Sequence, residues 1–296
     1  MSNNGETGSA TVLEVNNLKK YYPSVKAVDD ISFEVNAGEI VSILGPNGAG
    51  KTTTIEIIEG LRTKDEGEIS YFGRFKEVNN EVKNRVGVCF QENSFFEDLT
   101  VSETIRLYKS LYEKSLDTKE LIEIFELGEK VKTRIRHLSG GQKQRLAVAL
   151  AFVNDPDLVF LDEPTVGLDP HARRNLWEII LKFKSQGKGI VLTTHYMDEA
   201  QQLSDKVYIM DHGNIIAAGS PQELINSSGL ESVIEFPEES SALFEDVIIA
   251  GEYAYLHTRD TVSAIRKLLE SNVTNFVVRQ PTLEDVFLKL TGKKID

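Results

Sequence analysis

The sequence is almost free of cysteine and has no long apolar run, and each absence excludes a class of protein. Cys89 is the single cysteine among 296 residues, so no disulfide can form within the chain, which fits a reducing compartment. No stretch approaches the roughly 18 apolar residues of a membrane-spanning helix. Residues 1–10 are polar and lack the apolar segment of a signal peptide. We therefore expect a flexible N-terminus, a cytoplasmic location, and any membrane role to depend on a partner.

Basic residues are also in short supply. The chain has 33 Lys and Arg against 46 Asp and Glu, which gives a formal net charge of −13. Proteins that bind nucleic acids without strong selectivity usually carry a basic face, so we expect no nucleic-acid partner. Apolar residues make up 41% of the chain, which is ordinary for a globular protein and sufficient for one large domain with a smaller one.

The most informative feature that is present is a glycine-rich loop, 45–52, that fits the phosphate-binding template G-x-x-x-x-G-K-[ST] at every position. It follows an apolar run, 40–44, that reads as a buried strand, and it opens a helical pattern, 52–61. Glycines let successive backbone N–H groups surround a phosphate, and the helix N-terminus adds its positive dipole end. Lys51 can reach the terminal phosphates and the Thr52 hydroxyl can ligate Mg²⁺. The residues expected to contact the nucleotide here are Gly45, Pro46, Asn47, Gly48, Ala49, Gly50, Lys51, Thr52 and Thr53.

Two carboxylates end a second apolar run. Residues 158–161 predict a buried strand, and Asp162 and Glu163 follow it directly. Ligands bind at the carboxyl ends of strands in an open α/β sheet. Asp162 can hold the Mg²⁺ shell, and Glu163 can orient or deprotonate the water that attacks the γ-phosphorus. With the phosphate loop upstream, this pair predicts hydrolysis of a nucleoside triphosphate.

A third motif, Ser139-Gly140-Gly141-Gln142, predicts a second anion site. Ser139 is placed to cap a helix that starts at Gly140. The two adjacent glycines leave the N–H groups of that helix end open, and a cap alone does not require them, because each costs about 1 kcal/mol inside a helix relative to alanine.

Strand-like and helix-like segments alternate from residue 11 to about residue 220. This predicts a mostly parallel α/β sheet, and the short turns between the first strands favour an antiparallel β unit at one side. We expect strands at 12–15, 31–35, 40–44, 85–90, 158–161, 189–193, 207–210 and 215–217. We expect helices at 52–61, 101–112, 118–125, 140–153, 172–185 and 197–203.

The composition changes after residue 220. We expect residues 11–220 to form the ATPase domain, with a helical subdomain at about 92–156, and residues 221–296 to form a small α+β accessory domain. That domain should contain a helix at 260–270, a strand at 275–279 and an amphipathic helix at 282–290. Its removal is expected to leave the nucleotide-binding fold intact.

The motif 139–142, followed by Lys143-Gln144-Arg145, resembles the signature of ATP-binding-cassette (ABC) ATPases, and the likeness extends over residues 11–220. The resemblance implies a P-loop ABC cassette fold, with ATP and Mg²⁺ as cofactors. By position, it implies further roles in the site. The residues concerned are Tyr22 stacking on adenine, Gln91 reaching Mg²⁺ or the water, Asp169 in the D-loop, and His195 contacting the γ-phosphate. The catalytic set is then Glu163, His195 and Gln91; the metal ligands are Thr52, Gln91 and Asp162; and the second cassette's contacts are Ser139, Gly140, Gly141 and Gln142.

The family also implies partners. Two cassettes close head to tail on two ATP molecules, so we expect a homodimer or heterodimer together with a separate transmembrane permease. The segment 280–288 resembles the tail of the drug-resistance and ABC-2-type exporter group, which favours an ATPase subunit of an exporter. Two alternatives remain open at this point: a soluble ABC ATPase of translation, repair or iron–sulfur assembly, and an importer ATPase.

Overall fold

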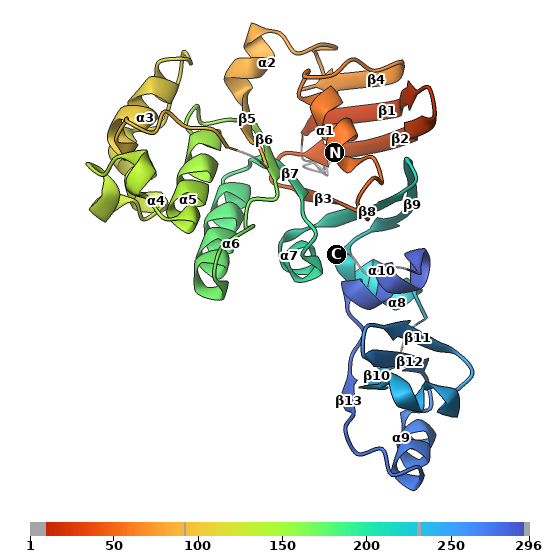
Figure 1. Cartoon of the computed structure of the whole chain (residues 1–296). Helices are drawn as coiled ribbons and strands as arrows, with labels where there is room; N and C mark the ends of the chain where they lie inside the picture. The colour runs from red at the N-terminus through yellow and green to blue at the C-terminus, as the bar shows by residue number, and fades with distance from the viewer. Residues whose placement is uncertain (1–9, 92, 230–231, 293–296) are drawn as a thin grey trace, which may run out of the picture.

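The computed structural model describes residues 10–91, 93–229 and 232–292, so nearly all of the expected flexible N-terminus, 1–10, lies outside the described residues. Its centre is a six-stranded sheet of order β5-β6-β7-β3-β8-β9, in which every neighbouring pair is parallel except β8 and β9 (Figure 1). This mostly parallel sheet confirms the predicted fold class. The strands are β3 (Ile40–Leu44), β5 (Val86–Cys89), β6 (Leu158–Asp162), β7 (Gly189–Thr193), β8 (Lys206–Asp211) and β9 (Asn214–Gly219).

A second, antiparallel sheet of order β2-β1-β4 shares a hydrophobic cluster with one face of the central sheet. Its strands are β1 (Thr11–Tyr22), β2 (Val25–Asn36) and β4 (Glu66–Tyr71). The sequence predicts β1 and β2 as much shorter strands and does not predict β4. The residues it misses carry charged side chains: Lys19 pairs with Glu66 at 2.8 Å and Lys20 with Asp65 at 2.7 Å. Ion pairs therefore flank this end of the sheet, where an apolar pattern is absent.

The two faces of the central sheet are covered by different elements. In β6, Leu158 and Phe160 belong to the cluster that contains α1 (Lys51–Ile58) and the antiparallel sheet. Val159 and Leu161 belong to the cluster that contains α5 (Gly140–Ala151) and α6 (Pro170–Ser185). Because both faces are buried, the strand reads as a continuous apolar run. Polar residues appear only where the strand ends, which is where the site lies.

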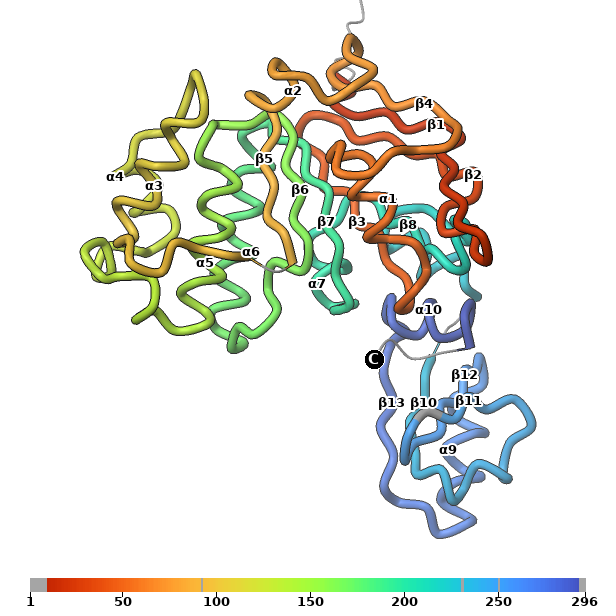
Figure 2. Tube along the Cα trace, turned by 45° about the horizontal axis from the view of Figure 1, so that its top comes forward, coloured from red at the N-terminus to blue at the C-terminus, as the bar shows by residue number. Residues whose placement is uncertain are grey.

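Helices α3 (Val101–Lys109), α4 (Thr118–Ile124) and α5 form a lobe beside β5, within the range expected for the helical subdomain (Figures 1 and 2). The short α2 (Asn80–Arg85) leads into β5. Phe125 and Phe152 of the lobe pack on Phe183 of α6, with ring centroids 6.0 and 3.9 Å from it. Aromatic stacking therefore joins the lobe to the layer that covers the sheet.

The C-terminal part of the chain is built differently from the expectation of one separate unit. A sheet of order β11-β12-β10-β13 is covered by α9 (Thr261–Glu270), with which it shares its own cluster. Its strands are β10 (Ser232–Pro237), β11 (Val247–Ala250), β12 (Tyr253–Thr258) and β13 (Val277–Arg279). However, α8 (Pro221–Ser227) and α10 (Leu283–Thr291) lie between this small domain and the large one (Figure 1).

Helices α8 and α10 share a hydrophobic cluster with the large domain. Leu224, Ile225, Leu283, Val286 and Phe287 pack there. They contact residues of β3, β8 and α7 (Met197–Leu203), namely Leu44, Val207, Ile209, Met197 and Ala200. The backbone N–H of Leu283 also donates to Gln201 Oε1 at 3.0 Å. No helix in the described ranges is long and apolar enough to cross a membrane.

Candidate active site

The phosphate loop connects β3 to α1, and its glycines are required by close backbone contacts. Gly48 and Gly50 have φ angles of 81° and 104°, which side chains other than glycine rarely adopt. A Cβ at Gly50 would lie 2.1 Å from the carbonyl oxygen of Ala27. No side chain caps the N-terminus of α1, so its first N–H groups point out of the helix without such a partner. The loop therefore offers backbone donors at the positive end of a helix, which suits a phosphate.

Lys51 lies across this loop. Its Nζ donates to the carbonyl oxygens of Gly45, at 2.7 Å, and Pro46, at 3.2 Å. Burial lowers the pKa of the Lys51 ammonium group, and the carboxylates of Glu163 and Asp162 oppose part of that change. Thr52 and Asn47 are exposed, and Thr53 is half-buried, around the same turn. Lys51 is thus the cation that brings the loop and the two acidic residues into one electrostatic unit.

Asp162 ends β6 and pairs in register with Thr193 on β7. The Thr193 hydroxyl donates a hydrogen bond to Asp162 Oδ1. Burial raises the pKa of Asp162, while the Thr193 hydrogen bond and Lys51 lower it. The sequence analysis assigns no role to Thr193, because a contact between neighbouring parallel strands leaves no signal within either strand.

Glu163 and His195 form a hydrogen-bonded pair. Glu163 has a φ of 50°, a left-handed conformation that is uncommon for a residue with a side chain and is often found at functional sites. Its Oε2 lies 2.7 Å from His195 Nδ1 and accepts the backbone N–H of His195 at 3.4 Å. Burial raises the pKa of Glu163, and the His195 ring opposes part of the rise. A buried carboxylate oriented by a histidine is the arrangement expected of a general base.

Ser139 caps α5 as expected. Its hydroxyl accepts the N–H of Gln142 at 3.3 Å, and the Gln142 side chain accepts the N–H of Ser139 at 3.1 Å, which completes a capping box. Ser139 and Gly140 are exposed, and Gly141 is half-buried. In both views α5 and α1 stand on opposite sides of β5 and β6, so the two helices at which the sequence predicts anion sites are held apart within one chain (Figures 1 and 2).

The remaining expected residues, Tyr22, Gln91 and Asp169, differ in their contacts and exposure. Asp169 caps α6 by accepting the N–H groups of His171 and Ala172, each at 3.0 Å. Tyr22 ends β1, is partly exposed, and its hydroxyl accepts a hydrogen bond from Arg62 at 2.8 Å. Gln91 is exposed two residues after the end of β5, and its neighbour Glu92 lies outside the described residues. Gln144 Nε2, which the sequence does not single out for a role, donates to Pro164 O at 3.0 Å and so joins α5 to the turn after Glu163.

The half-buried carboxyl of Glu59, at the C-terminal end of α1, predicts a pH-dependent stability. Burial, with smaller contributions from Asp162 and Glu56, raises the pKa of Glu59 from 4.5 to about 8. Between these values the unfolded chain releases a proton that the folded chain keeps, so the free energy of unfolding falls as pH rises through this window. Glu59→Gln should raise the free energy of unfolding by roughly 3–5 kcal/mol at pH 8 and by little at pH 4.5. Thermal unfolding of both proteins at the two pH values checks this, and an equal gain at both would contradict it.

Comparisons with known proteins were made on sequence and on structure. The family described as ABC transporter matches residues 28–166, and the family described as nodulation factor export protein NodI, C-terminal domain, matches residues 237–292. A Nod factor export ATP-binding protein I from Ralstonia nicotianae is 36% identical over 308 residues, covering 97% of this chain and 96% of the relative. A protein of the same name from Burkholderia lata is 37% identical over 297 residues, covering 96% and 98%.

Solved structures give the same family. The ATP-binding subunit of an ABC transporter matches with a TM-score of 0.67 and 32% identity, covering 74% of this chain and 94% of that chain. A dimeric ATP-binding cassette in a post-hydrolysis state, bound to ADP and Pi, matches with a TM-score of 0.62 and 25% identity, covering 70% and 98%. These matches confirm the resemblance that the signature and phosphate-loop motifs indicate. The chain therefore belongs to the ABC transporter family, as an ATP-binding and ATP-hydrolysing subunit related to the Nod factor export ATP-binding proteins.

Proposed function

We propose that the chain hydrolyses Mg²⁺-ATP to drive export through a separate transmembrane permease. The observation that carries the proposal is the Glu163–His195 pair, 2.7 Å apart, next to Lys51 and Asp162 at the end of the phosphate loop. Glu163 acts as the base for the attacking water. His195 orients the Glu163 carboxylate and contacts the γ-phosphate. The relatives support export as the direction of transport. Their names describe export, and their likeness to this chain covers nearly their whole length.

The donor set fits Mg²⁺. No group of three or more His, Cys, Asp or Glu residues that could hold a metal occurs in the part of the chain that the structure describes. Mg²⁺ does not require one, because it usually keeps several waters and takes one or two protein oxygens together with phosphate oxygens. The Thr52 hydroxyl, the Asp162 carboxylate and the Gln91 amide oxygen are the hard ligands that we assign to it. Asp162 is already oriented by Thr193 for this task.

A second cassette completes each site. Ser139 and Gly140 are exposed at the start of α5, which stands on the other side of β5 and β6 from α1 and its phosphate loop (Figure 1). We propose that this helix end contacts the ATP bound by a partner cassette, and that Asp169 lies at the interface between the two cassettes. Tyr22 stacks on the adenine bound within its own chain. The partner is a second copy of this chain or a related subunit.

A groove beside β5 supplies the surface for the permease. It has a volume of 760 Å³ and lies between α2, β5 and the end of α3. Phe90 and Leu111 line it and are 45% and 67% exposed, and Tyr108 and Tyr112 form part of its wall. Polar side chains such as Asn80 and Lys83 also line it, and a groove of this mixed kind suits a short amphipathic helix. Because Phe90 precedes Gln91, a permease segment in the groove is next to a proposed metal ligand. With a permease bound in this groove, the protein would lie at the cytoplasmic face of the membrane.

Leu111→Glu should separate permease binding from catalysis. A charge in the groove opposes burial of an apolar partner, so the amount of permease that co-purifies should fall at least about tenfold, which corresponds to 1.4 kcal/mol. The ATPase rate of the isolated subunit should stay unchanged. Leu181→Glu is the matched control, because Leu181 is an exposed leucine on α6 outside the groove. Equal recovery of the permease with both variants would contradict the docking site.

The experiment that tests the function is an affinity purification of the Glu163→Gln protein from gently solubilised membranes with ATP and Mg²⁺. Recovery of a protein with several membrane spans is expected. Recovery of only soluble partners would instead support a non-transport ABC ATPase. In inside-out vesicles that contain the recovered permease together with the wild-type subunit, ATP added outside should drive cargo into the lumen, whereas an importer would move it out.

A further inference from the structure

A buried acidic residue near the site has no part in the roles assigned above. Glu199 lies on α7 and is completely buried. Its Oε1 accepts the indole N–H of Trp177, on α6, at 2.9 Å. A buried carboxyl is unfavourable unless it is hydrogen-bonded, so leucine or methionine would fill this space at a lower cost in stability. The side chain is therefore placed for its hydrogen bonds, and these bonds join two helices that each begin beside the site.

The two helices follow two functional turns. Helix α6 begins directly after Asp169, and α7 begins two residues after His195. Thr165 lies in the turn after Glu163, and Thr194 precedes His195. The hydroxyls of Thr194 and Thr165, with the Trp177 indole, lower the pKa of Glu199, which burial raises. Glu199 therefore lies between the turn after Glu163, the turn that carries His195, and the helix that follows Asp169.

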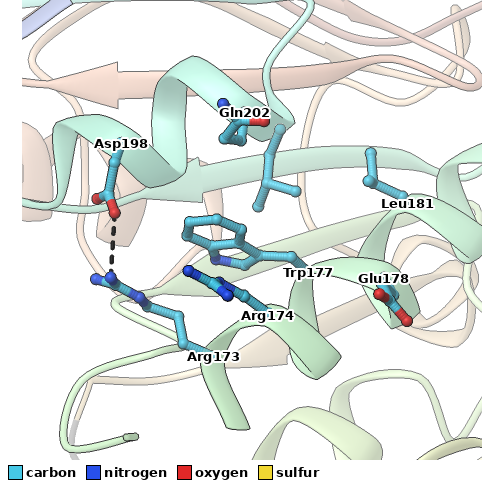
Figure 3. A pocket seen from close by; sticks show the side chains of 8 residues that line it. Arg173, Arg174, Trp177, Glu178, Leu181, Asp198 and Gln202 are labelled. Carbon is cyan, nitrogen blue, oxygen red and sulfur yellow. Dashed lines mark ion pairs between the residues drawn. The ribbon is translucent and has the colours of Figure 1, made fainter. Parts of the chain in front are cut away.

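A chain of ring and cation contacts continues from this junction to the histidine. The Arg173 guanidinium lies over the rings of Trp177 and Tyr196, at 5.3 and 5.0 Å from their centroids. It also pairs with Asp198 at 3.1 Å, as Figure 3 shows at the mouth of a 460 Å³ pocket between α6 and α7. The Tyr196 ring centroid is 4.0 Å from that of His195. The same two helices are thus joined once in the interior and once at the surface.

The buried contact between α6 and α7 leaves two polar atoms without hydrogen-bond partners among the described residues. Glu199 Oε2 and Thr165 Oγ1 are both buried and have no hydrogen-bond partner of good geometry among the described residues. They are near neighbours, since Thr165 is one of the groups that lower the pKa of Glu199. A small movement of the turn after Glu163 toward α7 would pair them, and buried polar atoms favour such pairing strongly.

We propose that Glu199 and Trp177 are positioning residues. They hold α6, the helix that follows Asp169, against α7, the helix that follows His195, so that the Asp169 and His195 turns adopt the geometry for hydrolysis together. The proposal rests on the function proposed above, because it assumes that Glu163 and His195 act on ATP. It assigns Glu199 no contact with the nucleotide. Glu199 instead affects the geometry of Glu163 and His195, whose Oε2 and Nδ1 atoms lie 2.7 Å apart. A misplacement of a catalytic group by about 1 Å can lower a catalytic rate about 100-fold.

Trp177→Phe and Glu199→Leu test the proposal by separating rate from binding and stability. Phenylalanine keeps a ring but removes the indole N–H, and leucine removes the carboxyl while filling its volume. We expect kcat to fall about 10–100-fold in each, with KM for ATP within about twofold of the wild type. The unfolding temperature of Glu199→Leu should be unchanged or higher, since the buried carboxyl is gone. Glu199→Gln, which still accepts the indole N–H, should retain most of the activity.

Two further readouts keep the test specific. The double variant Trp177→Phe, Glu199→Leu should be no slower than either single variant, because both remove the same bond. Gln202→Ala, on the rim of the same pocket, is the control and should turn over ATP like the wild type. Trp177 is the only tryptophan of the chain, so its fluorescence should shift in Glu199→Leu and report the lost bond in a folded protein.

Wild-type kcat in Trp177→Phe and Glu199→Leu would overturn the proposal. So would a loss of ATP affinity and unfolding temperature that matches the loss of rate, because that result describes a purely structural role. Glu163→Gln distinguishes the two levels. If Glu163→Gln stops hydrolysis and the Trp177 and Glu199 variants do not slow it, only this inference fails. If Glu163→Gln also hydrolyses ATP normally, the proposed catalytic function fails as well.

Discussion

Glu163→Gln should bind ATP and hydrolyse it about 10²–10⁴-fold more slowly than the wild type, the usual cost of losing a general base. The amide cannot take a proton from water, whereas its shape matches the carboxylate and its oxygen can still face His195. The change also removes a negative charge from the place where the γ-phosphate binds. We therefore expect ATP affinity to be equal or higher and the ATP-bound dimer to persist. Phosphate release, nucleotide binding and size-exclusion chromatography with Mg²⁺-ATP measure the three quantities.

Glu178→Gln is the matched control, because Glu178 is an exposed carboxylate on α6 outside the nucleotide site. It should behave as the wild type in all three measurements. Wild-type turnover by Glu163→Gln would remove Glu163 from the role of base. Loss of binding together with turnover would show instead that the carboxylate organises the site in its resting state.

Deletion of residues 221–296 should leave a chain that does not fold stably. The deletion removes five apolar side chains that are 7% exposed or less, from Leu224, Ile225, Leu283, Val286 and Phe287. Burial of one such side chain stabilises a fold by about 1.5–3 kcal/mol. Five together reach the order of the 5–15 kcal/mol by which a whole domain is typically stable. Circular dichroism, thermal unfolding and the yield of monodisperse protein measure the effect.

An internal deletion is the control for this truncation. Replacing residues 230–278 with a Gly/Ser linker of about ten residues, which spans roughly 17 Å, removes the small domain but keeps α8 and α10. The linker reaches about 33 Å when fully extended, which allows it to pass α10, about 13 Å long, and the four retained residues 279–282 before it. The far end of α10 is close to α8, since Lys289 Nζ lies 2.7 Å from the carbonyl oxygen of Ser228. Arg279 is retained because its Nη2 holds the buried Asp285 at 2.8 Å.

The internally deleted protein should fold and hydrolyse ATP, in contrast to the truncated one. Equal folding of both proteins would show that a division at residue 220 is sufficient. We propose a different division, in which α8 and α10 remain with the ATPase domain and the detachable unit comprises β10–β13 and α9. The shared cluster of α10 and α7 supports it.

The parts of the fold that the sequence predicts well are those whose signal is local. Strands β3 and β7 and helix α7 begin and end where the apolar pattern does, because each is enclosed by polar or turn residues. The phosphate loop and the capped α5 are predicted for the same reason: glycines and a cap residue act within a few positions of themselves. Strand β4 is not predicted, since Glu66 and Glu68 break its apolar pattern.

The parts that the sequence does not predict depend on contacts between distant segments. Thr193 acquires its role from Asp162 across two strands, and Glu199 acquires its role from Trp177 across two helices. The amphipathic pattern of α10 shows that the helix buries one face, but not which surface covers it. It packs on the large domain rather than on the small domain that immediately precedes it.

This placement of α10 has a consequence for how the protein is made. Leu44 leaves the ribosome long before Phe287, which belongs to the same cluster. At the usual 5–20 residues per second, the apolar edge around Leu44, Val207 and Ile209 stays uncovered while the intervening small domain is synthesised. A nascent chain therefore cannot cover this edge of its ATPase domain before α10 has been made. Chains cut short before α10 would carry an open apolar edge, which cellular quality control can recognise before a defective subunit reaches the membrane.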